Sequence, residues 1–237
     1  MGITVKKEYR RQNTELRMVV AGLIVAAVAG AQGRGGNPLP NMNEIAQSLG
    51  VECQYCHSAE RGSGLPEPRK DIARAMMAMT RDLNAKVQSA TGKAAADATE
   101  VKCITCHRGV PIPKQLSEIV TQTLLKDGAT AAVSQYRELR SHYYGHQAYD
   151  FGEDTLIGIA ERFSNARPDD SIALMKLNVE FYPQSARSLA AMAFAYTRKY
   201  DDRTAISILE DALKIDPDNG IIQGQLEQLK SYQRRRN

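Results

Sequence analysis

All four cysteines of the 237-residue chain lie in two copies of one pattern, C-x-x-C-H, at residues 53–57 and 103–107. In this pattern the two thiols form thioether bonds with the vinyl groups of a haem, and the histidine binds its iron. No cysteine is left over for another role. We therefore predict two covalently bound haem c groups. The predicted thioether residues are Cys53, Cys56, Cys103 and Cys106, and the predicted iron ligands are His57 and His107.

Zinc binding, a redox-active cysteine pair and disulfide bonds each explain the two motifs less well than haem. A four-cysteine zinc site gives no reason for a histidine after both pairs, and structural zinc usually brings its pairs closer in sequence. A thioredoxin-like redox pair would need a βαβ unit around the motif, and two disulfides are the plain alternative for a secreted protein. The repeated histidine favours haem over all three.

A methionine precedes each motif on a predicted helix, and methionine is a common sixth ligand in electron-transfer haem proteins. Before the first motif, Met42, Ile45, Ala46 and Leu49 recur at helical spacing, and Gly50 can end the helix. This periodicity does not separate an iron ligand from a core residue.

Before the second motif, residues 71–92 predict one long helix with the apolar stripe Ile72, Met76, Met79, Leu83 and Val87. Met76 and Met79 share a face, so one could bind iron while the other packs on the macrocycle. We favour Met76 as the ligand and keep Met79 as the alternative. Met77 lies off the stripe.

The N-terminal residues 1–31 predict a signal peptide. Five basic and two acidic residues precede an uncharged run of 14 residues at 18–31, which ends in Ala29, Gly30 and Ala31. A helix of that length covers about 21 Å of a hydrocarbon layer of about 30 Å, so cleavage is favoured over an uncleaved anchor or a buried helix. We therefore expect a periplasmic protein, with the outer face of the inner membrane as a further location.

The segments NPLPNMNEIAQSLGVECQYCH, ARAMMAMTRDLN and VKCITCHRG, within residues 37–113, resemble the cytochrome c subunit of photosynthetic reaction centres. In that family each haem unit is a Met-bearing helix followed by a turn and C-x-x-C-H. The resemblance implies that Met42 pairs with His57, that Met76 pairs with His107, and that the haems pack closely as an electron relay. The family subunit carries four haems, whereas this chain has two motifs, so we expect a dihaem form in residues 32–117.

Residues 118–237 resemble tetratricopeptide repeats. Pro183 and Pro217 are 34 residues apart, which is the period of such repeats. This register assigns packing positions to Leu189, Ala193, Tyr196, Ala205, Leu209 and Ala212, and more loosely to Leu156, Ile159, Ser171 and Met175. A further helical pair is expected at 116–126 and 129–144. The alternative is a set of helices packed without repeat register.

The predicted fold class is therefore all-α, with a multihaem c-type cytochrome domain followed by helical-hairpin repeats. The net charge of +4 is small and spread along the chain, which argues against nucleic-acid binding. His142 and His146 are four residues apart and could share a helical face, but a zinc-protease motif would need Glu at position 143, which is Tyr. We expect them to be surface or packing residues.

These features predict a protein that is not an enzyme: an exported dihaem c-type cytochrome that transfers single electrons between periplasmic or membrane redox partners. A membrane-bound electron-transfer complex is one setting for it, and the repeats would dock a partner protein. The alternatives are a dihaem peroxidase-type enzyme, in which one iron opens a site for peroxide, and a redox-sensing scaffold protein.

Overall fold

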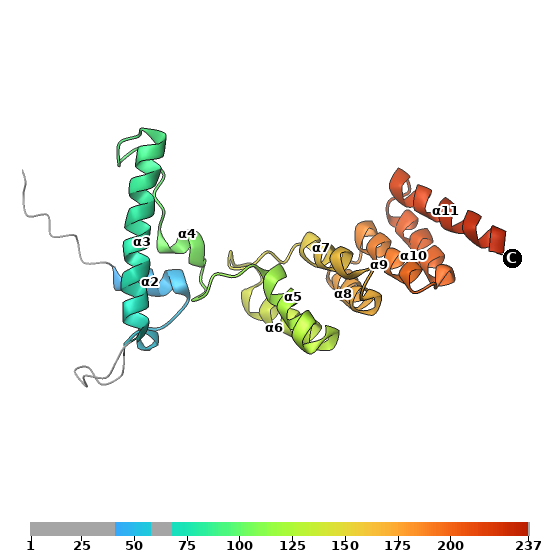
Figure 1. Ribbon diagram of the computed structural model, residues 1–237, viewed down its shortest axis with the longest axis horizontal. Helices are drawn as coiled ribbons and strands as arrows, with labels where there is room; N and C mark the ends of the chain where they lie inside the picture. Colours follow the sequence, from blue (N-terminus) through green and yellow to red (C-terminus); the bar gives the residue numbers. More distant parts are fainter. Residues whose placement is uncertain (1–40, 58–67, 237) are drawn as a thin grey trace, which may run out of the picture. The chain divides into compact units, whose positions relative to one another are not determined.

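The computed structural model describes residues 41–57 and 68–236, and every regular element in them is helical (Figure 1). The predicted signal peptide at 1–31 lies outside the described residues. The all-α fold class is confirmed. None of the described helices is both long enough and apolar enough to cross a membrane.

The part that contains the two motifs consists of α2 (Met42–Leu49), the 3-10 turn η1 (Cys53–Tyr55), α3 (Pro68–Thr91) and α4 (Cys103–His107). Both helices predicted from apolar spacing are confirmed. Each is followed by a glycine with positive φ, +63° at Gly50 and +65° at Gly92, a conformation that glycine adopts without a Cβ penalty.

Gly50 is also the point where the two motif segments touch. The amide of Gly109 donates a hydrogen bond to the carbonyl of Ser48 at 2.9 Å. A Cβ atom built on Gly50 would lie 2.1 Å from the carbonyl oxygen of Gly109. The backbone just before the first motif therefore packs directly on the backbone just after the second.

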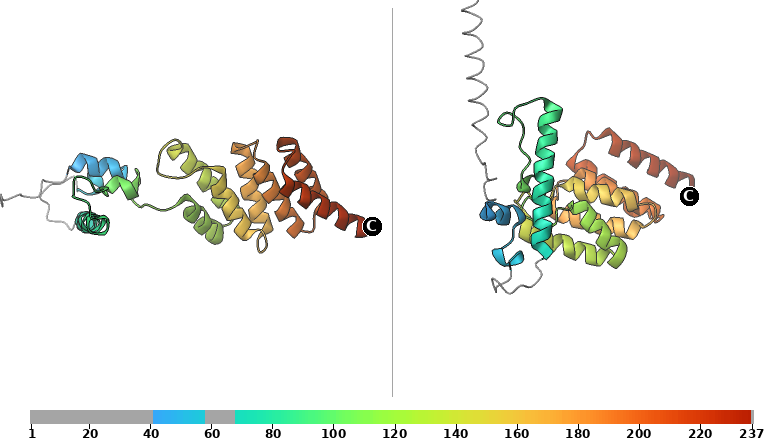
Figure 2. Two further views of the ribbon diagram at one scale, coloured as in Figure 1. Left: turned by 90° about the horizontal axis from the view of Figure 1, so that it is seen from above. Right: turned by 60° about the vertical axis from the view of Figure 1, so that its left-hand side comes forward.

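The remaining helices form consecutive hairpins: α5 (Leu116–Asp127) with α6 (Ala129–Tyr143), α7 (Glu153–Phe163) with α8 (Pro168–Phe181), and α9 (Ala186–Arg198) with α10 (Asp202–Ile215). The last helix, α11 (Gly220–Arg236), packs on α10 (Figure 2). The helical pair expected at 116–126 and 129–144 is confirmed as α5 and α6. Helices α9 and α11 begin 34 residues apart, at Ala186 and Gly220.

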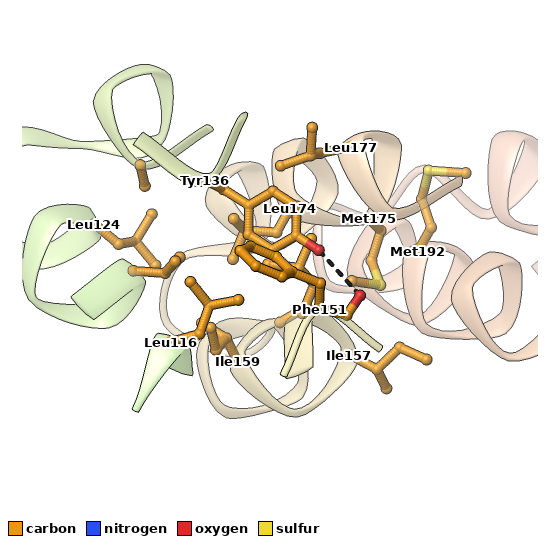
Figure 3. Packing of buried hydrophobic residues seen from close by; sticks show 14 residues of the cluster. Leu116, Leu124, Tyr136, Phe151, Ile157, Ile159, Leu174, Met175, Leu177 and Met192 are labelled. Atoms are coloured by element: carbon orange, nitrogen blue, oxygen red, sulfur yellow. Dashed lines mark hydrogen bonds between the residues drawn. The ribbon is translucent and has the colours of Figure 1, made fainter. Parts of the chain in front are cut away.

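One apolar core joins helices α5 to α9 (Figure 3), and a second cluster lies among α9, α10 and α11. The centre of the first core is Tyr136, which is fully buried and donates a hydrogen bond to the carbonyl of Phe151 at 3.4 Å. Burial raises the pKa of Tyr136 to about 12, so its hydroxyl keeps its proton to higher pH than that of an exposed tyrosine.

The positions assigned by the 34-residue spacing pack as expected. Four of them are buried, Ala193, Ala205, Leu209 and Ala212, and the other two, Leu189 and Tyr196, pack against the same cluster. The looser set of Leu156, Ile159, Ser171 and Met175 is fully buried as well. The tetratricopeptide register itself remains a prediction.

His142 and His146 are surface residues, as expected. The shared helical face that their spacing allowed does not form, because α6 ends at Tyr143 and Gly145 turns the backbone with φ of +84°. Both side chains are exposed, and Nδ1 of His142 lies 2.9 Å from the carbonyl oxygen of Glu138.

The contact at Gly50 is testable by comparing Gly50→Ala with Gly92→Ala. Both substitutions place an alanine in left-handed backbone, which costs about 1–2 kcal/mol. A Cβ at Gly92 meets no atom within 4 Å, whereas a Cβ at Gly50 collides with the backbone of Gly109. We expect Gly50→Ala to lower the urea midpoint further than Gly92→Ala.

Hydrogen exchange gives the local readout for the same pair of variants. The Gly109 amide should exchange faster in Gly50→Ala, because its bond to Ser48 must open to relieve the collision. It should be unchanged in Gly92→Ala. Equal effects of the two substitutions on the midpoint and on this amide would contradict the contact.

Candidate functional site

Each C-x-x-C-H motif folds as a single helical turn. In the first, the amide of His57 donates to the carbonyl of Cys53 at 3.0 Å, and in the second the five motif residues form α4. Residues three apart on a helical turn lie on one side of it. The two thiols of each motif therefore share a side, which is the arrangement needed to bond two vinyl groups of one porphyrin.

The residues that lead into the two turns are also equivalent. Glu52 and Lys102 are both extended, with ψ of 167° and 169°. Each accepts at its carbonyl a hydrogen bond of 3.0 Å from the amide three residues later, Tyr55 in the first motif and Thr105 in the second. The duplication visible in the sequence is thus a duplication of backbone geometry.

The imidazole of His107 is oriented by the backbone that follows it. Its Nδ1 lies 3.0 Å from the carbonyl oxygen of Val110. A carbonyl can only accept, so Nδ1 must carry the proton, and the neutral ring then presents the lone pair of Nε2. Arg108, in left-handed conformation with φ of 51°, and Gly109 make the turn that brings this carbonyl back. Such a second hydrogen bond is typical of a metal-ligating histidine.

The four thiols are free and partly or fully exposed, Cys53 and Cys106 most of all. Within residues 41–57 and 68–236, no three His, Cys, Asp or Glu side chains gather closely enough to hold a metal ion together.

The long helix α3 has no buried side chain between residues 69 and 91. Three apolar residues of its predicted stripe stand exposed, namely Ile72 at 62 %, Met79 at 45 % and Leu83 at 37 %. Met76 lies on the same stripe and is partly buried. An exposed apolar face of this kind fits a large, flat, apolar group, as a porphyrin is.

The other candidate ligand, Met42, is the first residue of α2 and is 52 % exposed. Its side chain is thus accessible. Met77 is partly buried and lies away from the exposed stripe of α3.

Two residues that connect α3 to the motifs were missed in the sequence. The side-chain carboxamide of Asn84 makes two hydrogen bonds to the backbone of Val101. It donates to the Val101 carbonyl at 2.9 Å and accepts from the Val101 amide at 2.7 Å. Arg69 donates to the carbonyl of Tyr55, inside the first motif, at 3.1 Å. Single polar contacts of this kind have no periodic pattern that a sequence would reveal.

Comparison with known proteins bears on the second motif in particular. Residues 66–150 match the family model of the photosynthetic reaction centre cytochrome C subunit. The match contains the second motif, begins after the first, and runs beyond residue 117, where we expected the repeats to begin, into the loop that follows α6.

Two curated proteins are similar to a short stretch of the chain. Cytochrome c-554 of Chloroflexus aurantiacus is 34% identical over 67 residues, which are 28% of this chain and 16% of that protein. The photosynthetic reaction center cytochrome c subunit of Rubrivivax gelatinosus is 36% identical over 64 residues, or 27% of this chain and 16% of that protein. The chain thus spans less than a fifth of the length of either relative.

The resemblance inferred from the motifs is confirmed: residues 66–150 are similar to the photosynthetic reaction centre cytochrome C subunit, and the chain shares short similar stretches with the two curated relatives.

Proposed function

We propose that this chain is an exported dihaem c-type cytochrome that transfers single electrons between periplasmic or membrane redox partners. The observation that carries the proposal is the lack of a protein core around the two motifs. Among the described residues before Val110, Ser48 alone is buried, whereas the buried apolar residues all lie from Val110 onward.

A helix of 24 residues such as α3 needs an apolar partner, because helices in water gain most of their stability from packing. Its exposed stripe, together with exposed Ile104 inside the second motif, offers the apolar surface that a porphyrin would cover. Two haem groups tethered at the two helical turns would therefore complete this part of the fold.

The residues that would hold the haems divide by role. Cys53 and Cys56 would bond the first haem and Cys103 and Cys106 the second, with His57 and His107 as iron ligands. We propose Met42 and Met76 as the opposite ligands, with Met79 as the alternative to Met76. Haem iron supplies one-electron chemistry, and sulfur ligation raises its potential. An iron bound by both a histidine and a methionine would have no open position for substrate, which favours electron transfer over peroxidase chemistry.

The hairpins α5 to α11 would serve as the docking region for a redox partner. Stacked helical hairpins provide an extended surface that suits protein partners. A membrane-bound electron-transfer complex is a fitting destination for such a chain, since the Rubrivivax gelatinosus relative is named as a reaction center subunit.

An optical redox titration of the matured protein tests this function. We expect two one-electron steps with the spectra of six-coordinate, low-spin haem in both states. We also expect slow reaction of the reduced protein with peroxide, because no iron position is open. A five-coordinate spectrum together with rapid peroxide turnover would overturn the proposal in favour of an enzyme.

The sulfur ligands are tested by four Met→Leu variants, which keep the apolar volume and remove the sulfur. Met42→Leu and Met76→Leu should each remove about half of the weak sulfur-to-iron charge-transfer absorption, as expected when one of two equivalent sites is lost. Met77→Leu, off the stripe, is the matched control and should leave the band unchanged. A full band in Met76→Leu with a diminished band in Met79→Leu would assign the second iron to Met79 instead.

A further inference from the structure

Two polar side chains of α3, at different positions along the helix, link it to the two motifs. Near its start, Arg69 donates to the Tyr55 carbonyl at 3.1 Å and places its guanidinium 4.4 Å from the centre of the Tyr55 ring. Fifteen residues later, or about 22 Å along the helix axis, Asn84 binds the backbone of Val101. The two candidate sulfur ligands, Met76 and Met79, lie between these links.

The Asn84 contact fixes the orientation of α3 as well as its distance from the segment before the second motif. A carboxamide presents a donor and an acceptor side by side, and these meet the carbonyl and the amide of one residue, at 2.9 and 2.7 Å. Two bonds to the backbone of one residue hold the helix against rotation about its own axis, which a single bond would allow. The contact is partly buried, so water competes with it less than at an exposed site.

Its position along the chain makes this contact relevant to the second motif. Val101 lies two residues before Cys103, so the residue that Asn84 binds leads directly into the turn bearing both thiols and His107. No side chain of α3 between residues 69 and 91 is buried. In the described structure, the position of the helix is therefore not fixed by buried apolar contacts.

We propose that Asn84 is a positioning residue that sets where the methionine sulfur of α3 meets the second haem iron. This inference rests on the proposed dihaem function. A rotation of α3 moves its methionines sideways relative to the second motif, so loss of the Asn84 clamp weakens sulfur ligation at that iron. The first haem is not touched by this clamp.

The test uses a chain in which Cys53→Ala and Cys56→Ala leave only the second haem attached. On that background we compare Asn84→Ala and Asn84→Gln with Lys86→Ala, a control at an exposed position two residues further along α3. The readouts are the sulfur-to-iron charge-transfer band and the midpoint potential of the single haem. A merely structural role would move the unfolding midpoint and leave both of these unchanged.

We expect Asn84→Ala to lose most of the band and to lower the midpoint potential, because weaker sulfur ligation removes the effect that raises it. Asn84→Gln keeps the carboxamide and should show a smaller change, and Lys86→Ala should match the parent. If Asn84→Ala binds no haem, Asn84→Gln decides in its place. Parental band and potential in the haem-loaded Asn84 variant would overturn the inference.

The failure of this inference is distinguishable from the failure of the proposed function. A parent protein without a second covalent haem, or without the charge-transfer band, would refute the function before any Asn84 variant is made. A parent with both features and insensitive Asn84 variants would refute the positioning role alone.

Discussion

We infer that the part of the chain that carries the two motifs depends on a bound group for its core, because the polypeptide does not provide one. Helices α5 to α11 enclose a core of fully buried residues such as Leu124, Leu156 and Leu174. Helix α3 is longer than any of them and buries none of its side chains between residues 69 and 91. A porphyrin tethered at each helical turn would supply the missing apolar surface, so cofactor attachment and folding would be coupled in this part.

The second motif shows how the backbone orients a predicted iron ligand. The turn through Arg108 and Gly109 returns the Val110 carbonyl to Nδ1 of His107, and the same Gly109 amide is held by Ser48, at the end of α2. The orientation of one predicted iron ligand thus depends on a contact with the segment that leads into the other motif. Asn84 and Arg69 add a second connection through α3, so the two motifs form one linked framework.

Much of this arrangement could be predicted from local rules. The spacing of the paired thiols and histidines alone predicted haem attachment. Apolar periodicity with a following glycine predicted α2 and α3 to within a few residues. The small and apolar residues of α9 and α10 followed from a 34-residue spacing. The contacts of Asn84 and Arg69 could not be predicted in this way, because they are hydrogen bonds between a side chain and backbone groups that are distant in the sequence. His142 and His146 are surface residues, as expected, but the shared helical face that their spacing allowed is absent because α6 ends before Gly145.

The most direct test of whether haem forms the core of this region is hydrogen exchange of α3, compared between two proteins. One is the matured protein, and the other is a haem-free form with all four cysteines replaced by alanine. Intact mass of the matured sample counts the covalent haems at the same time, and two are expected. The account predicts that α3 amides are protected with haem and exchange rapidly without it, while α5 to α11 are protected in both. Equal protection of α3 in the two forms would show that the polypeptide holds this helix by itself, and would contradict the account.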